Sequence, residues 1–360
     1  MLDFKELTEL KIDAPDREFF EKVRKTWDSI SKPIDGLGDF EKTVCRIAAI
    51  QRTDRPDISK RAAVIFCADN GIVEEGISQS GKEITLSVAR ALGSGISSAC
   101  TLAKSAGVTV VPVDVGIDAD ESISGVRDMK VRKGTENFLK APAMTEREAL
   151  LAIEHGIELV KELSDGGVKI ISTGEMGIGN TTTTTATLSA LLNMNPDELT
   201  GRGAGLSDEG LARKRFVIKK GIEKYSFDNI KDPAEKAFEI LRCLGGLDIA
   251  ALSGAFIGGA LYHVPMVIDG VISATAALVA EALLPGTKDC LIPSHKGREK
   301  GNALALSRLG LKPLIGGNMA LGEGTGAIML FPVLDIVLYY YRNGAKFSDY
   351  HIDEYRRLCK

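Results

Sequence analysis

The 360-residue sequence has few aromatic side chains and no hydrophobic run long enough to cross a bilayer. Aromatic residues make up 6% of the chain, and no basic run is interleaved with them, so a surface that stacks on nucleic-acid bases is not expected. The net charge of −4 also argues against nucleic acid or an anionic membrane as a general partner. The most apolar run, near residues 327–341, contains Asp335 and is predicted to be a buried helix.

Cysteine and histidine are also sparse. The six cysteines include no CxxC pair and no dense framework, so neither a disulfide scaffold nor a zinc site is indicated. The four histidines lack the spacing of metal ligands, and we expect no metal. The first twenty residues have no apolar core of the signal-peptide type, and a reducing cytoplasm fits best. These cysteines and histidines are Cys45, Cys67, Cys100, Cys243, Cys290 and Cys359, and His155, His263, His295 and His351.

Short β-rich runs alternate with longer helical ones over most of the chain. Near-continuous apolar strands bounded by helices indicate an α/β fold with a mostly parallel sheet covered on both faces. The expected strands are 62–68, 108–115, 168–173, 265–269 and 290–294. The expected helices are 83–105, 146–164, 181–193, 207–224, 234–243, 247–261, 272–283 and 297–309.

Three further helices lie outside this alternation. Residues 16–31 and 39–53 have helical spacing of apolar positions, and the third helix begins near residue 327. They suggest a small helical domain built from both chain ends, 1–55 and 328–360, beside a large domain over 56–327 that carries the active site.

Glycine and polar residues follow each expected strand. The segments are CADNG, DVGID, STGEMGIGN, IDGVIS and PSHKG. Because ligands bind beyond the carboxyl ends of the strands in open α/β sheets, these ends indicate one composite site. The alternative is that turns between strands and helices need Gly and Asp in any case.

Two glycine-rich loops are candidates for phosphate binding. Residues 174–182, GEMGIGNTT, follow a strand and open a helix, where backbone N–H groups and the helix dipole favour an anion. Asn180 or Thr181 is a candidate cap for that helix, and a capped turn without a ligand is the alternative. Residues 201–207, GRGAGLS, precede a second helix on which Lys214 is a plausible phosphate partner, although helix surfaces carry lysines routinely.

Glu175 and Glu323 are carboxylates in glycine-rich settings, the second within ALGEGTGA at 320–327. Glycosyl chemistry uses carboxylates for proton transfer and to stabilise an oxocarbenium-like transition state. Restricted hydration raises the pKa of a glutamate toward neutrality, which makes it a better base. Each glutamate could instead brace its loop. Ser294-His295 lacks a GxSxG elbow, and a Ser-His nucleophile is disfavoured.

The loops together resemble the nicotinate-nucleotide–dimethylbenzimidazole phosphoribosyltransferase family, whose members activate the lower ligand of cobamides. The match runs in order over roughly 30–340. It comprises ADNGIVEEGIS (68–78), VDVGI (113–117), RKGTENF with PAMT (132–145), GEMGIGNTT (174–182), GRGAGL with LARK (201–214), GGLDIAALSGA (245–255), VIDGVISA (267–274) and GLKPL with LGEGTGA (310–327).

The resemblance implies transfer of 5-phosphoribosyl from nicotinate mononucleotide to a benzimidazole nitrogen, with inversion and loss of nicotinate. It implies a Rossmann-like α/β domain, a helical domain from both chain ends, a homodimer and no cofactor. Glu323 would be the general base, with Glu175 as a second catalytic residue. The nucleotide phosphate and ribose would bind at Gly177, Gly179, Asn180, Thr181, Gly203 and Lys214, and the base pocket would include Asp69, Ser80, Lys82 and Met176.

The sequence departs from the family pattern at four places. Asn70 replaces the usual His, Gly81-Lys82 a Pro-Gln pair, Asp248 a Glu, and Ala320 an Arg. Since the Pro-Gln glutamine belongs to the acceptor pocket, we hypothesise a different or broader set of acceptors, such as another benzimidazole, a purine or a phenolic. The alternatives are a non-catalytic nucleotide-binding regulator on the same fold, and a dinucleotide-dependent oxidoreductase, which the missing GxGxxG disfavours.

Overall fold

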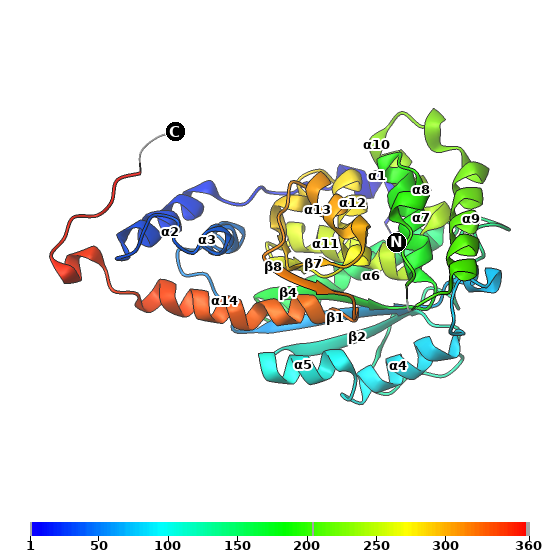
Figure 1. Cartoon of the computed structure of the whole chain (residues 1–360), viewed down its shortest axis with the longest axis horizontal. Helices are drawn as coiled ribbons and strands as arrows, with labels where there is room; N and C mark the ends of the chain where they lie inside the picture. The colour runs from blue at the N-terminus through cyan, green and yellow to red at the C-terminus, as the bar shows by residue number, and fades with distance from the viewer. Residues whose placement is uncertain (1, 204, 358–360) are drawn as a thin grey trace.

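The computed structural model describes residues 2–203 and 205–357. Within these residues a six-stranded sheet has the order β3-β2-β1-β4-β5-β6, and all its pairs are parallel (Figure 1). This is the order of a Rossmann fold, in which the chain reverses direction between β1 and β4 and leaves a crevice beyond their carboxyl ends. The strands are β1 Arg61–Ala68, β2 Thr109–Gly116, β3 Arg127–Asp128, β4 Ile170–Met176, β5 Met266–Ile268 and β6 Leu291–Pro293.

Helices cover both faces of the sheet. One face packs on α6 Glu146–Asp165, α10 Pro233–Leu244, α11 Leu247–Leu261 and α12 Val271–Leu283, and the other on α4 Glu83–Gly93, α5 Ser98–Ala106 and α14 Thr325–Asn343. Strand β1 shows why both faces are apolar. Val64 and Phe66 belong to the core cluster on the α6 side, whereas Ile65 and Cys67 belong to the cluster on the α14 side. Successive side chains of a strand point to opposite faces, so a doubly covered strand is apolar throughout.

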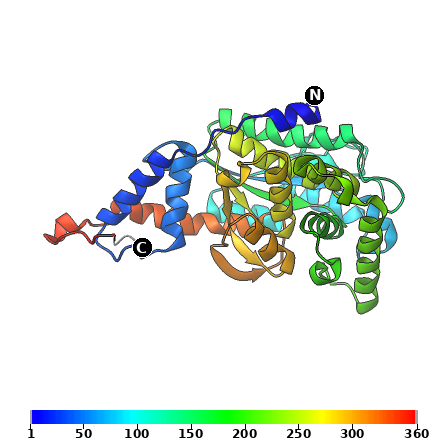
Figure 2. The ribbon, with the colours of Figure 1, turned by 90° about the horizontal axis from the view of Figure 1, so that it is seen from above.

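The remaining elements extend these layers. Helices α7 Asn180–Leu192, α8 Pro196–Leu199, α9 Asp208–Tyr225 and α13 Lys300–Arg308 lie on the α6 side, with the parallel pair β7 His295–Gly297 and β8 Ile315–Met319. Helix α1 Phe4–Glu9 lies beside α6 (Figure 2), and the backbone N–H of Leu2 donates to Glu154 at 3.0 Å. Short 3₁₀ helices are η1 Gly71–Glu75, η2 Phe227–Asn229, η3 Thr287–Cys290 and η4 Phe347–Tyr350.

Helices α2 Arg17–Ser29 and α3 Asp39–Gln51 lie beside the C-terminal half of α14, at one end of the molecule (Figure 1). The rings of Trp27 and Tyr341 are 5.1 Å apart, and Trp27 is fully buried. The same apolar cluster continues without a break onto the sheet. The division into two domains stays a prediction.

Two expected helices were wrong in their extent. The helix expected over 83–105 is two helices, because Gly95 adopts a left-handed φ of 75° and the Ser97 hydroxyl caps α5 by accepting from the Cys100 N–H at 3.1 Å. The helix expected from 297 begins at Lys300, because residues 295–297 pair with β8 instead. Among the described residues, no helix combines the length and the hydropathy that a membrane span requires. Cys359 lies outside the described residues, and the five other cysteines are free and buried.

Candidate functional site

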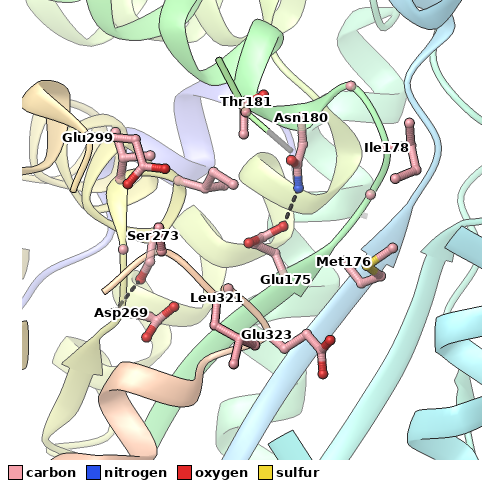
Figure 3. Close-up of a pocket in the computed structure, with 18 of the residues that line it drawn as sticks. Glu175, Met176, Ile178, Asn180, Thr181, Asp269, Ser273, Glu299, Leu321 and Glu323 are labelled. Carbon is pink, nitrogen blue, oxygen red and sulfur yellow. Dashed lines mark hydrogen bonds between the residues drawn. The ribbon is translucent and has the colours of Figure 1, made fainter. Parts of the chain in front are cut away.

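A cavity of about 260 Å³ lies at the carboxyl ends of β4 and β5 (Figure 3). Three of the five loops expected to form a composite site, those that follow β4, β5 and β6, line it together. The segments CADNG and DVGID, which follow β1 and β2, are not among the described residues that line it. Its walls come from the end of β4 and the start of α7, the segment before α9, the start of α12, and the loop between β8 and α14. Both candidate carboxylates, Glu175 and Glu323, and the candidate cation Lys214 are among the lining residues.

Glycines bring the two carboxylate-bearing loops into backbone contact. A Cβ at Gly174 would lie 2.6 Å from the backbone nitrogen of Gly324, so no side chain fits there. Gly322, Glu323 and Gly324 have φ values of 85°, 56° and 74°. Glycine adopts this left-handed region freely, but a glutamate does so at a cost of about 1–3 kcal/mol. The surrounding contacts therefore hold Glu323 in a strained conformation at the rim of the cavity.

The Glu323 carboxylate points toward α5, away from Glu175 (Figure 3). Its Oε2 accepts a hydrogen bond of 3.3 Å from the backbone N–H of Ala99, in the first turn of that helix. The side chain is half-buried, which leaves it open to an incoming molecule.

Glu175 takes part in a buried network at the other side of the same rim. The Asn180 Nδ2 donates to Glu175 Oε2 and also to Asp248 Oδ2, the latter at 3.1 Å. Burial, followed by the Asp248 charge, raises the pKa of Glu175 to about 8. Burial likewise raises the pKa of Asp248, at the start of α11, to about 6. The expected capping role of Asn180 was wrong: Gly179, with a φ of 92°, precedes α7, and no side chain caps it.

Lys214 and Thr181 lie together at the far wall. The Lys214 Nζ donates to Thr181 Oγ1 at 2.7 Å, and the lysine side chain is 1% exposed. Burial lowers the pKa of Lys214 to about 8. A Cβ at Gly203 would lie 3.3 Å from Thr181 Oγ1 and 3.6 Å from Lys214 Nζ, so the two glycine loops meet at this cation. Gly177 is also held closely, because a Cβ there would meet the Ala68 carbonyl oxygen at 2.2 Å.

A third group, in which Asp269 joins the Ser294-His295 pair considered from the sequence, lies between the β5 and β7 ends. Asp269 Oδ1 accepts from the Ala327 N–H at 3.0 Å and lies 3.9 Å from His295 Nδ1. Ser294 Oγ lies 2.9 Å from the same ring nitrogen and 2.6 Å from the Ile268 carbonyl oxygen. A catalytic serine and its acid partner use opposite nitrogens of the histidine, so this group is not arranged as a nucleophilic triad.

Of the four residues predicted to form the base pocket, one lines the cavity and three do not. Met176 lines the cavity, whereas Asp69, Ser80 and Lys82 are not among the described residues that line it. Asp69 Oδ2 accepts from the Asp118 N–H at 2.8 Å, and Lys82 Nζ forms an ion pair with the Asp118 carboxylate at 3.1 Å. The Ser80 N–H donates to Ser78 Oγ at 3.2 Å.

The neighbouring segment also reaches the second glycine loop, because Gln79 Nε2 donates to the Gly205 carbonyl at 2.6 Å. Within residues 2–203 and 205–357, no three His, Cys, Asp or Glu side chains gather as metal ligands.

A family model described as phosphoribosyltransferase matches residues 12–352. The chain belongs to this family. It is 43% identical over 340 residues to the nicotinate-nucleotide–dimethylbenzimidazole phosphoribosyltransferase of Acetivibrio thermocellus, covering 94% of this chain and 95% of that one. Identity to the Clostridium acetobutylicum protein of the same name is 40%, with 96% and 97% covered. The crystal structure of CobT from Thermus thermophilus superposes with a TM-score of 0.87 at 33% identity, covering 94% of this phosphoribosyltransferase and 100% of that chain.

Proposed function

We propose that this phosphoribosyltransferase moves the 5-phosphoribosyl group of nicotinate mononucleotide to a nitrogen of dimethylbenzimidazole or a related base. The products are nicotinate and an α-ribazole 5'-phosphate. The observation that carries the proposal is one cavity in which a buried cation, Lys214, and two glycine-flanked glutamates, Glu175 and Glu323, line the same space. The names of the relatives, which span nearly the whole chain, support the choice of substrates.

The donor nucleotide binds with its phosphate at Lys214. The ammonium group supplies a charge-assisted hydrogen bond, and Thr181, one residue into α7, adds a hydroxyl. Gly177, Gly179 and Gly203 keep this wall free of side chains, and the N-terminal N–H groups of α7 favour an anion. Asn180, the first residue of α7, precedes Thr181 and binds the ribose.

Glu323 is the general base. The glycosidic nitrogen of the donor is a cationic pyridinium, so it takes the bonding electron pair and leaves as neutral ring nitrogen without an acid. The incoming azole nitrogen forms the new bond to C1' on the opposite face and inverts it, and its N–H proton goes to the Glu323 carboxylate. The glycines on both sides of Glu323 allow a flat ring to approach its carboxylate.

Turnover of nicotinate mononucleotide with 5,6-dimethylbenzimidazole tests this function, with nicotinate release measured for the wild type and Glu323→Gln. We expect the substitution to lower the rate about a hundredfold or more, the usual contribution of a general base. Glu158→Gln, which changes an exposed carboxyl of α6 that is not among the described residues lining the cavity, is the matched control and should leave the rate unchanged. An unchanged rate in Glu323→Gln would remove this residue from the mechanism. Nucleotide binding with no release in the wild type would favour the regulatory alternative.

The acceptor range is broader than dimethylbenzimidazole alone. The support is the segment around Gly81 and Lys82, where the family pattern has a Pro-Gln pair and this chain has an ion pair between Lys82 and Asp118 instead. Relative turnover of a benzimidazole, a purine and a phenolic measures the range, and strict preference for dimethylbenzimidazole would contradict it.

The protein is a homodimer, and helix α14 contributes to the contact. Met329, Ile336 and Tyr339 are 45%, 71% and 70% exposed and lie on the side of this helix that faces away from its buried residues. A contiguous apolar face of this kind is typical of a protein interface. Sedimentation of the wild type and Ile336→Glu tests it. A dimer that persists unweakened in the variant would exclude this face.

A further inference from the structure

The structure holds a second buried acid, Asp248, that no step of the transfer reaction uses. Asp248 is 0% exposed, lies at the start of α11, and is not among the described residues that line the cavity. Its Oδ1 accepts from the Ile249 N–H at 2.9 Å, and its Oδ2 accepts from Asn180 at 3.1 Å. A buried ionised carboxyl without a cationic partner is destabilising, so its retention beside the site requires a reason.

Asn180 joins Asp248 to Glu175. Its Nδ2 carries two protons, and one is directed to each carboxyl. An amide supplies a dipole and no net charge, so it orients both acids without neutralising either. The geometry therefore fixes the Glu175 carboxyl at the cavity wall and brings two acids into one buried network.

Other acids surround this pair. Asp269 follows β5 and Glu323 precedes α14, and both act on Glu175. Burial, followed by the charges of Asp114, Glu175 and Asp248, raises the pKa of the Cys67 thiol of β1. Like charges that share a buried site cannot all ionise, so protons are retained by the members whose ionisation is least favourable.

Asn70 lies at the other side of Asp248. It is 0% exposed, and its Oδ1 has no hydrogen-bond donor. This atom and Asp248 Oδ1 lie 2.7 Å and 2.4 Å from the position that a Cβ would take at Gly246. An amide carries no net charge, so Asn70 does not neutralise the Asp248 carboxyl.

We propose that Asp248 is a positioning residue, which through Asn180 holds the Glu175 carboxyl in place and keeps it protonated at neutral pH. The proton is useful because the cavity must admit an anionic nucleotide. Glu175, Glu299, Asp269 and Glu323 all line it. A neutral Glu175 removes one of these charges and faces the substrate as a hydrogen-bond donor. The pKa values raised by burial, about 8 for Glu175 and about 6 for Asp248, agree with Glu175 as the group that keeps the proton.

This inference rests on the proposed function for its purpose, but its first test does not require turnover. Infrared difference spectroscopy of the ligand-free protein follows the carbonyl stretch of protonated carboxyls as the pH is raised. We expect a band that disappears near pH 8 in the wild type and is absent from Glu175→Gln. In Asp248→Asn the midpoint should fall by about one pH unit, since a neighbouring charge is removed. In Asp248→Glu, which keeps a carboxylate at this position, the midpoint should return to its wild-type value.

Asp114→Asn is the matched control, because Asp114 is also buried at a strand end, is 4% exposed, and pairs with Lys130 away from the cavity. Asp114→Asn should leave the pH midpoint of the Glu175 band unchanged. The second readout is the Kd of nicotinate mononucleotide against pH, which should rise as the band disappears, and at lower pH in Asp248→Asn. A Glu175 band that titrates near the ordinary glutamate value, about 4.3, or that does not respond to Asp248→Asn, would overturn the proposal. Loss of turnover with an intact band would contradict only the proposed reaction.

Discussion

Replacement of Lys214 by methionine should make the ligand-free protein more stable. The side chain is 1% exposed, and its pKa is lowered from the ordinary 10.5 to about 8 by burial. Since one pKa unit corresponds to about 1.4 kcal/mol, the buried charge destabilises the fold by on the order of 3 kcal/mol. Methionine has a similar length and no charge. It loses the hydrogen bond to Thr181, worth about 1 kcal/mol, so a net gain of about 2 kcal/mol is expected at pH 7.

The stability gained by Lys214→Met should decrease as the pH rises. Unfolded lysine binds its proton up to pH 10.5, whereas folded Lys214 releases it at about pH 8. Wild-type stability therefore rises with pH between these values, and the advantage of Lys214→Met is full below pH 8 and vanishes above 10.5.

Denaturant unfolding at pH 7 and pH 10 measures the effect, and calorimetry measures the affinity for nicotinate mononucleotide. That affinity should fall about thirtyfold or more, since loss of one partner of a buried charge pair costs about 2 kcal/mol or more. Lys219→Met, an exposed lysine of the same helix, should change neither quantity. A less stable Lys214→Met with unchanged affinity would refute both the unfavourable burial of this charge and its role at the phosphate.

Three further outcomes are expected. Gly326→Ala should lower the unfolding free energy by about 1–3 kcal/mol, because its Cβ would lie 2.2 Å from the His295 ring, whereas Gly316→Ala, with open space, should not. Glu175 keeps its proton to about pH 8 when folded, so wild-type stability falls as pH rises from 4.5 to 8; Glu175→Gln should be the more stable by at least about 2 kcal/mol at pH 9 in denaturant unfolding. Arg357→Gln removes two bidentate ion pairs and should speed proteolysis of the segment after α14, leaving turnover unchanged.

The long elements could be predicted from the sequence because one physical signal defines each. Helix α6 has helical spacing and a Thr145–Glu148 capping box, and β1 is an unbroken apolar run. The break between α4 and α5 also had a local signal, the GSGIS segment that starts at Gly93, which the apolar periodicity on either side outweighed. Strands β7 and β8 had no local signal, since HKG and IGGNM pair with each other across residues 298–314.

In the candidate site, too, the features with a local sequence pattern could be predicted and those formed by distant residues could not. The glycine loops and their glutamates are local patterns, and the chain folds them around one cavity. The association of Asp248 with Glu175 could not be predicted, because they are 73 positions apart in the sequence and are connected through the side-chain amide of Asn180. The conformation of Glu323 is likewise set by its contact with the end of β4, which the sequence around it does not reveal.

The crossing of the two loops at Gly174 and Gly324 has a consequence for how the enzyme can change. Each glutamate is the immediate neighbour of a glycine in this crossing, so the distance between the backbones that carry the two carboxylates is set by main-chain contact. Residues such as Met176, Leu321 and Ala320 can then be exchanged without altering that distance. Acceptor choice is then free to diverge among descendants, or to be redesigned at the bench, while the backbones of the two glutamates keep their spacing.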